Sequence, residues 1–221
     1  MNISTQAVRL VLFIMRGSMK KALIITGGYI NFNKIDINSD LYDLIIAADS
    51  GYISAEKLKI LPNIIVGDFD SSKKPNINTK IVSFPTEKDE TDTMIACNMA
   101  IDDGCEDLTI VGGTGGRIDH LLSNVFSLEC LKAKGINSVL TDGENEITVL
   151  KNETVSISSK NKYFSIFSIG ECKVTLSGCK YPLTEYTLPR YNPSYAVSNE
   201  VIDEYATVSV SGTAFLCKCI K

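Results

Sequence analysis

Short apolar runs, each closed by turn-forming residues, recur along the first part of the chain and constrain its fold more than any other feature. These runs are residues 22–26, 44–48, 64–66, 81–83, 108–111 and 138–140. Within each run the apolar residues are continuous rather than alternating with polar ones, which is typical of strands buried on both faces of a parallel sheet. We therefore expect these runs to be strands of one mostly parallel sheet.

Helical patterns lie between several of these runs. Residues 92–101 place Ile95 and Met99 on one stripe, and Thr91 is a suitable N-cap. Residues 118–134 form a longer amphipathic pattern with Gly135 as its stop. Its predicted buried face consists of Leu121, Leu122, Val125, Leu128 and Leu131. This alternation of strands and helices predicts a doubly wound α/β domain with helices on both faces of the sheet.

The residue pattern changes near position 145. Apolar and polar residues alternate in residues 146–150, 154–157, 163–169, 173–176 and 207–218. Such alternation predicts antiparallel strands with one face toward solvent. The 221 residues therefore divide into an expected N-terminal extension (1–18), an α/β domain (19–145) and an antiparallel β domain (146–221). The β domain is small for an independent core, so we expect it to pack against the α/β domain or a second subunit.

Charge, cysteine content and the first residues narrow the class of protein. The net charge is −4 and the basic residues are scattered, so we expect no nucleic-acid partner. The seven cysteines are odd in number and several lie in apolar stretches, as expected for reduced thiols. Residues 8–15 are apolar except for Arg9, but this run is too short to span a bilayer. We expect a cytoplasmic protein without a membrane partner.

A pair of carboxylates follows the third apolar run, in the sequence Gly67-Asp68-Phe69-Asp70-Ser71. Side chains at i and i+2 of an extended segment point the same way, so Asp68 and Asp70 can face one point in space. Close carboxylates repel each other unless a cation lies between them, and Mg²⁺ prefers oxygen ligands and commonly accompanies phosphates. The alternative is a surface turn, because Gly, Asp and Ser all form turns.

The neighbouring runs also end in residues that suit a ligand. Asp49 follows the second run, residues 86–92 follow the fourth, and a glycine-rich segment (residues 112–116, the glycine loop) follows the fifth. Ligands of open α/β sheets bind beyond the carboxyl ends of the strands, so we expect these segments to meet at one site. The charged residues in 88–92 could instead be a solvated helix start.

The glycine loop opens a predicted helix, where backbone amides and the helix dipole favour an anion such as phosphate. Arg117 and His120 lie in the first turn of that helix, where positive charge does not help the dipole, and this favours a ligand-binding role. A structural hydrogen bond to Asp119 or the backbone is the alternative role for His120, the only histidine.

Taken together, these segments resemble the motifs of the thiamine pyrophosphokinase family in order and spacing. The motifs are Ala48-Asp49-Ser50-Gly51, Gly67-Asp68-Phe69-Asp70-Ser71, Lys88-Asp89-Glu90-Thr91-Asp92 and Gly112-Gly113-Thr114-Gly115-Gly116-Arg117-Ile118-Asp119-His120. The resemblance implies transfer of a pyrophosphoryl group from ATP to the hydroxyl of thiamine, which gives thiamine diphosphate and AMP. It also implies an ATP-binding catalytic α/β domain, a thiamine-binding C-terminal β-sandwich, and a homodimer with sites between the subunits.

The same resemblance implies roles for individual residues. Mg²⁺ would be held by Asp68, Asp70 and Asp92, and the catalytic residues would be Asp70, Asp92 and Lys88. ATP would contact Asp49, Thr91, Gly112, Gly113, Gly115, Gly116 and Arg117. The substrate would contact Asp119, His120, Ser198 and Asn199. Family members from animals and fungi have a Trp after the Ser-Asn pair, whereas this chain has no Trp, so the residue that stacks on thiamine is open. The group that accepts the hydroxyl proton is also open.

Two other functions fit the same motifs. One is a pyrophosphokinase for another alcohol, such as 6-hydroxymethylpterin, and the other is a non-catalytic nucleotide or thiamine sensor. A dinucleotide-dependent oxidoreductase is disfavoured because no GxGxxG follows the first strand.

Overall fold

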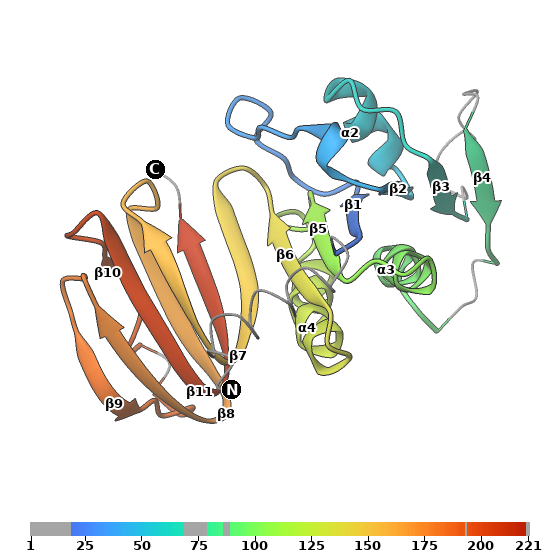
Figure 1. Cartoon of the computed structure of the whole chain (residues 1–221). Coiled ribbons are helices and arrows are strands. Elements are labelled where there is room, and N and C mark those ends of the chain that lie inside the picture. The colour runs from blue at the N-terminus through green and yellow to red at the C-terminus, as the bar shows by residue number, and fades with distance from the viewer. Residues whose placement is uncertain (1–18, 69–78, 86–88, 193, 220–221) are drawn as a thin grey trace, which may run out of the picture.

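The computed structural model describes residues 19–68, 79–85, 89–192 and 194–219. The parallel part of the sheet consists of β1 (Lys21–Ile25), β2 (Leu44–Ala48), β3 (Ile64–Gly67), β4 (Lys80–Ser83), β5 (Asp107–Val111) and β6 (Asn137–Thr141). The antiparallel part consists of β7 (Asn145–Ser158), β8 (Tyr163–Ser177), β9 (Leu183–Thr187), β10 (Asn199–Glu200) and β11 (Tyr205–Cys219). The predicted division into a mostly parallel sheet followed by antiparallel strands is confirmed (Figure 1).

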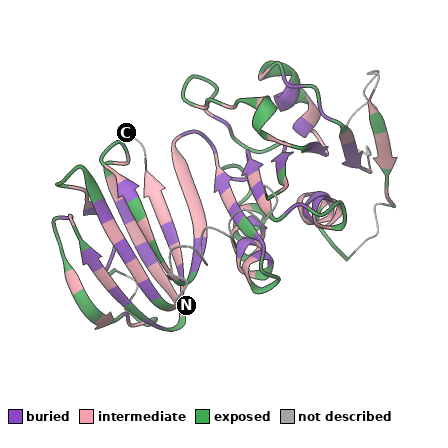
Figure 2. Ribbon diagram, in the orientation of Figure 1, coloured by how far each residue is buried: buried purple, intermediate pink, exposed green. Residues whose placement is uncertain are grey.

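Burial of the central strands explains why their sequences are continuously apolar. All five residues of β2 are buried, as are the last four residues of β1 (Figure 2). Strand β4 lies at the end of the strand order and none of its residues is fully buried. Central strands need apolar side chains on both faces, whereas an edge strand does not. Accordingly, the run 81–83 has only two apolar residues, Ile81 and Val82.

Helices cover both faces of the parallel part, as expected for a doubly wound domain. They are α2 (Gly51–Lys57), α3 (Asp92–Asp102) and α4 (Ile118–Ala133), with a short 3-10 helix η1 (Ser39–Leu41) before β2. Because alternate side chains of a strand point to opposite faces, Ile24 packs in the core with α3 and α4. Its neighbour Leu23 packs in the core with Ala55 of α2 on the other face.

One residue of the predicted buried face of α4 is misplaced. Leu122 is 48% exposed, because the buried face of the helix is centred on Asn124, Leu128 and Leu131. The prediction included Leu122 and passed over Asn124 because it followed the apolar residues alone.

The antiparallel strands are longer than their sequence pattern predicted. Segments 146–150 and 154–157 lie in the single strand β7, and 163–169 and 173–176 both lie in β8. Asn152, Gly170 and Gly212 adopt positive φ angles of 51°, 81° and 107°, and the register of β11 against β7 shifts between Val210 and Thr213. Bulges with one residue in the left-handed region interrupt the alternation without ending a strand, so sequence breaks that indicated turns are irregularities within strands.

A single hydrogen-bonded sheet joins the two parts, which the sequence did not predict. Strand β6 pairs in parallel with β5 on one side and antiparallel with β7 on the other. The full order is β10-β8-β11-β7-β6-β5-β1-β2-β3-β4, with β9 paired to β8. The antiparallel part has its own core around Phe164, Ile166 and Leu216.

The topology places the polar motifs at one edge. Chain order reverses between β5 and β1, and the carboxyl ends of β5, β1, β2 and β3 lie next to one another. This is the position at which open α/β sheets bind ligands. Among the described residues, no helix is both long enough and apolar enough to cross a membrane.

Candidate functional site

A cavity of about 370 Å³ lies at the carboxyl edge of the parallel strands, where the strand order reverses. It is lined by Thr26, Gly27, Gly28, Ala48, Asp49, Ser50, Thr91, Asp92, Thr93, Gly112, Gly113, Gly115, Gly116, Arg117, His120, Ser123 and Asn124. The ends of β1, β2 and β5 and the starts of α3 and α4 all contribute. The sequence segments predicted to meet are therefore brought together in one place.

The glycine loop forms one wall of the cavity and is held on two sides. Its residues Gly115 and Gly116 have φ angles of 74° and 70°, which residues other than glycine adopt with strain. From helix α4, Asn124 Nδ2 donates to the carbonyl oxygen of Gly113 at 3.0 Å. From the β1–β2 connection, the backbone N–H of Tyr29 donates to the carbonyl oxygen of Thr114 at 3.0 Å. The loop is therefore a fixed wall rather than a free surface turn.

The end of β1 approaches this wall so closely that only glycine fits. A Cβ atom on Gly28 would lie 1.7 Å from the carbonyl oxygen of Gly112, far inside van der Waals contact. Since both partners are backbone, neither can rotate away. The cavity is therefore bounded by two backbone segments whose polar groups are not covered by side chains, which suits a ligand that binds backbone amides.

Asp49 has two features that are unfavourable unless a ligand binds. Its φ angle is 49°, in the left-handed region that strains a non-glycine residue. Its Oδ1 atom is buried and has no hydrogen-bond partner among the described residues, although a carboxylate oxygen is costly to bury unpaired. Because Asp49 lines the cavity, this oxygen is a suitable ligand for a cation or a donor group.

The start of α3 brings Thr91 and Asp92 to the opposite wall. Thr91 is the N-cap of the helix, and its Oγ1 accepts a hydrogen bond from the N–H of Met94 at 3.3 Å. Asp92 occupies the first turn, where a carboxylate is favoured by the helix dipole. Both residues therefore have structural roles as well as positions in the cavity wall, so the predicted N-cap is confirmed.

The start of α4 carries an exposed ion pair beside the cavity. The guanidinium of Arg117 donates to both carboxylate oxygens of Asp119, from Nε at 3.1 Å and from Nη2 at 2.5 Å. The hydrogen bond from Arg117 lowers the pKa of Asp119, and the same bond raises the pKa of Arg117. Arg117 lines the cavity but Asp119 does not. The backbone N–H of His120 also donates to Asp119, at 3.0 Å, so Asp119 organises the first turn of the helix.

The predicted site residues fall into three groups. The cavity gathers Asp49, Thr91, Asp92, Gly112, Gly113, Gly115, Gly116, Arg117 and His120. Asp68, Asp119, Ser198 and Asn199 do not line it. Asp70 and Lys88, like the extension 1–18, lie outside the described residues. Within the described ranges, which do not include Asp70, no group of three or more His, Cys, Asp or Glu side chains is arranged to hold a metal ion.

Ser198 and Asn199 lie in the antiparallel part of the sheet. The Asn199 side chain is 2% exposed and is occupied by the backbone of Tyr181: its Oδ1 accepts from the N–H at 3.1 Å, and its Nδ2 donates to the carbonyl oxygen at 2.9 Å. Ser198 is exposed, has a φ angle of 56°, and donates its N–H to Ser165 Oγ at 3.0 Å. Asn199 therefore shapes this segment, and Ser198 is the member of the pair that a ligand can reach.

The remaining lining residues had no individual role in the sequence-based prediction: Thr26, Gly27, Gly28, Ala48, Ser50, Thr93, Ser123 and Asn124. Asn124 had a recognisable signal, because it lies on the buried face of α4 beside Leu128. A buried amide needs hydrogen-bond partners, and here the partner is the glycine loop.

Comparisons with known proteins agree with this geometry. Residues 39–140 match the family model "Thiamin pyrophosphokinase, catalytic domain", and residues 144–214 match "Thiamin pyrophosphokinase, vitamin B1 binding domain". The chain is 29% identical to a thiamine pyrophosphokinase of Bacillus subtilis over 202 residues, which cover 86% of this chain and 94% of the relative.

Solved structures give the same result. The crystal structure of thiamine pyrophosphokinase from Bacillus subtilis superposes with a TM-score of 0.79 at 27% identity, covering 91% of this chain and 100% of that one. A thiamin pyrophosphokinase family protein from Enterococcus faecalis gives a TM-score of 0.77 at 28% identity, covering 91% and 99%. The motifs, both family models and the shared fold agree, and the chain belongs to the thiamine pyrophosphokinase family of enzymes.

Proposed function

We propose that the chain catalyses the Mg²⁺-dependent transfer of a pyrophosphoryl group from ATP to the hydroxyl of thiamine, giving thiamine diphosphate and AMP. One observation carries the proposal: the same cavity combines a backbone wall suited to phosphate with the carboxylates Asp49 and Asp92. Phosphate groups and a divalent cation need these two environments side by side.

The donor atoms present fit a hard cation. The Oδ1 atom of Asp49 is buried at the cavity without a described partner, and Asp92 lines the same space. We propose that these two residues hold Mg²⁺ together with Asp68 and Asp70, of which Asp70 lies outside the described residues. A bound Mg²⁺ would neutralise charge on the phosphate oxygens as the transfer proceeds.

The chain's own groups would bind and orient the phosphates. The N–H of Gly112 donates to the carbonyl oxygen of Thr141 and the N–H of His120 donates to Asp119, so the donors would come from the rest of the glycine loop and from the first two residues of α4. The α4 N-cap, Arg117, makes no side-chain capping bond to those two amides. The Arg117 side chain is 71% exposed, so its guanidinium can exchange some contact with Asp119 for contact with a phosphate at little cost. Lys88, outside the described residues, is proposed as a second phosphate-pairing cation.

In the proposed reaction, the hydroxyl oxygen of thiamine attacks the β-phosphorus of ATP. The bond from that phosphorus to the oxygen bridging it to the α-phosphorus breaks, and AMP leaves with the electron pair. The hydroxyl proton passes to a carboxylate or to solvent, and Asp92 is the described candidate because it lines the cavity. Most of the acceleration would come from positioning and from fixed charge around the phosphates.

The thiamine side of the site would require a second copy of the chain. Strand β10, which begins at Asn199, is six strand positions from β1 in the sheet order. At roughly 4.8 Å per strand this is about 29 Å, too far for one thiamine to touch both Ser198 and the ATP cavity of the same chain. We therefore propose a homodimer in which Ser198 of one copy faces the cavity of the other.

An exposed apolar stripe beside the cavity supports this arrangement. Ile118, Leu122 and Phe126 recur every fourth residue along α4 and are 72%, 48% and 55% exposed. Residues at this spacing share one helix face, and contiguous exposed apolar surface commonly marks an interface. The stripe begins next to Arg117, so a partner docked on it would also close the cavity.

The decisive test is incubation of the purified chain with ATP, Mg²⁺ and thiamine, with chromatographic measurement of AMP and thiamine diphosphate. We expect the two products in equal amounts and no product when Mg²⁺ is chelated. AMP release with 6-hydroxymethylpterin but not with thiamine would instead identify the pterin as the substrate. Binding of ATP or thiamine without turnover would favour the sensor.

Mixed dimers test the shared site separately. Co-expression of an Asp49→Ala chain with a Ser198→Tyr chain should restore activity that neither variant has alone, because one cavity of the mixed dimer is intact. A protein that is monomeric by light scattering under assay conditions and fully active would rule out the dimer without affecting the reaction.

A further inference from the structure

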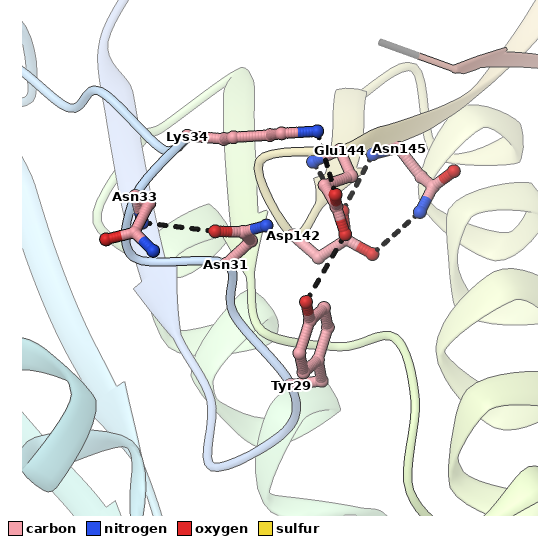
Figure 3. A network of polar contacts seen from close by, with 7 residues as sticks. All are labelled: Tyr29, Asn31, Asn33, Lys34, Asp142, Glu144 and Asn145. Carbon is pink, nitrogen blue, oxygen red and sulfur yellow. Dashed lines mark hydrogen bonds and ion pairs between the residues drawn. The ribbon is translucent and has the colours of Figure 1, made fainter. Parts of the chain in front are cut away.

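A polar network joins the β1–β2 connection to the turn from β6 into β7 (Figure 3). A hydrogen bond from Thr114 links the glycine loop to the same network. Asp142 lies at the centre of the network, directly after β6, and is 2% exposed. None of the functional assignments above uses it.

Every described contact of the Asp142 carboxylate is a hydrogen bond that it accepts. Oδ1 accepts from the backbone N–H groups of Glu144 at 2.8 Å and Asn145 at 2.7 Å. Oδ2 accepts from Asn145 Nδ2 at 3.0 Å and from the Thr114 hydroxyl at 2.5 Å. Four donors balance the cost of burying a charge. Three of them are local to the turn, and the fourth comes from the glycine loop.

The bond from Thr114 is the one that links the turn to the cavity. Thr114 is 8% exposed and does not line the cavity, whereas Gly112, Gly113, Gly115 and Gly116 all do. Its side chain therefore points away from the cavity and anchors the loop from behind. The bond spans 28 residues of sequence, so local backbone geometry does not enforce it.

The other described anchors of the loop are neutral and weaker. They are the Asn124 contact to Gly113, the Tyr29 backbone contact to Thr114, and the bond from the Gly112 N–H to the carbonyl oxygen of Thr141, all at 3.0 Å. Hydrogen bonds to a charged group are about twice as strong as neutral ones. The Asp142 bond is therefore expected to contribute most to the fixed shape of the loop.

We infer that Asp142 is a positioning residue that acts through Thr114 to hold the glycine loop in the shape that binds the phosphates of the nucleotide. The inference rests on the proposed function, because it concerns the same cavity. Asp142 would not touch the nucleotide. It would lower the entropy that the loop loses on binding, because the loop is already ordered in the free protein.

The outer part of the network is not expected to matter to the nucleotide. Glu144 accepts from Lys34 at 2.9 Å and from the Tyr29 hydroxyl at 3.3 Å, and both contacts are exposed. Exposed pairs of this kind contribute little. The inference therefore concerns the buried bond alone.

The test uses the full-length chain and substitutions at Thr114. Thr114→Val removes the hydroxyl with little change in shape, and Thr114→Ser retains it. Thr148→Val is the matched control, because the Thr148 hydroxyl donates to the carbonyl oxygen of Ser138 at 2.8 Å in the neighbouring strand pair, and neither residue lines the cavity. Asp142→Asn tests the same hydrogen bond from its other side, because it replaces the charged acceptor by a neutral amide.

Two quantities are measured: the Kd for ATP with Mg²⁺ by calorimetry, and hydrogen exchange of the amides of residues 112–116 in the free protein. Thr114→Val should weaken ATP binding and accelerate exchange in the loop by about tenfold each, as expected for loss of one charge-assisted hydrogen bond. Asp142→Asn should act in the same direction. Thr114→Ser and Thr148→Val should stay within about twofold of the unmodified chain. In turnover assays, KM for ATP should rise while KM for thiamine stays unchanged.

The outcomes separate this inference from the proposed function. If the unmodified chain binds no ATP, the proposed function fails and the inference fails with it. If the unmodified chain binds ATP but Thr114→Val binds it equally well, only the inference is overturned, whether or not loop exchange accelerates. Equal losses in Thr114→Val and Thr148→Val would also overturn it, because they would indicate general destabilisation.

Discussion

Replacing Asp49 by Asn should make the free protein more stable and the ligand-bound protein less stable. In the free protein, Asp49 Oδ1 is buried without a described partner, and the residue has a φ angle of 49°. A neutral amide is cheaper to bury than a carboxylate, and Asn tolerates the left-handed region better than most residues. The same carboxylate is proposed to hold Mg²⁺, which an amide binds poorly.

The structure sets the size of both effects. Relief of a buried unpaired charge should raise the free energy of unfolding by about 1 kcal/mol, which is roughly 2–4 °C in Tm for a chain of this length. ATP with Mg²⁺ at about 100 times Kd stabilises a protein by about 2.7 kcal/mol, and a hundredfold weaker Kd reduces this to about 0.4 kcal/mol. The unmodified chain should therefore be less stable than Asp49→Asn without ligand, and more stable by about 1.3 kcal/mol with it.

Thermal unfolding with and without ATP and Mg²⁺ measures both quantities in one experiment. Glu185→Gln is the matched control, because Glu185 also has a positive φ angle, 45°, but is exposed and far along the chain. Its free energy of unfolding should change by less than about 0.5 kcal/mol in either condition. A loss of stability in free Asp49→Asn would refute the reasoning, since it would mean that the carboxylate is already satisfied without a ligand.

Three further predictions concern the cavity wall, pH and thiol reactivity. In Gly28→Ala the new Cβ would lie 1.7 Å from the Gly112 carbonyl oxygen. The substitution should therefore weaken ATP binding and lower the free energy of unfolding, measured in urea, by about 1–3 kcal/mol. An unchanged unfolding free energy and an unchanged Kd for ATP would contradict the close approach. Burial raises the pKa of Asp142, but its hydrogen bonds outweigh this and hold the pKa below the usual value for Asp. Its stabilising effect should be complete above about pH 4, near the ordinary pKa of Asp, and lost as pH falls through the folded pKa. A pH titration of unfolding free energy should therefore be shallower below pH 4 in Asp142→Asn, and an unaltered slope would show that the carboxylate is not linked to folding. Burial raises the pKa of Cys97 to about 12, whereas Cys130 is exposed. Iodoacetamide at pH 8 should therefore modify Cys130 well before Cys97, as followed by mass spectrometry. The reverse order would contradict the packing of α3.

The sequence was sufficient for the parallel part of the fold because burial there depends on local composition. Strands such as β2 are apolar at every position because both faces are covered. The same argument fixed which ends of the strands would meet, and so brought Asp49 and the glycine loop to one cavity. The meeting of these segments at one cavity was thus predicted from the sheet topology more than from any single motif.

Contacts between distant segments could not be predicted in the same way. Asp142 is followed by Gly143, a pair typical of a turn, and nothing local shows that its carboxylate reaches Thr114. The joining of the two parts through β6 and β7 also depends on pairing that the pattern of one strand does not encode. The hydrogen bonds between the Asn199 amide and the backbone of Tyr181 likewise join distant segments, and no local pattern encodes them.

The central claim is that this cavity transfers a pyrophosphoryl group, and the nature of the second product tests it most directly. The purified chain is incubated with ATP, Mg²⁺ and thiamine, and the nucleotides are separated and quantified against thiamine diphosphate. Attack at the β-phosphorus predicts one AMP for each thiamine diphosphate. Formation of ADP with thiamine monophosphate would contradict the claim, because it would show attack at the γ-phosphorus.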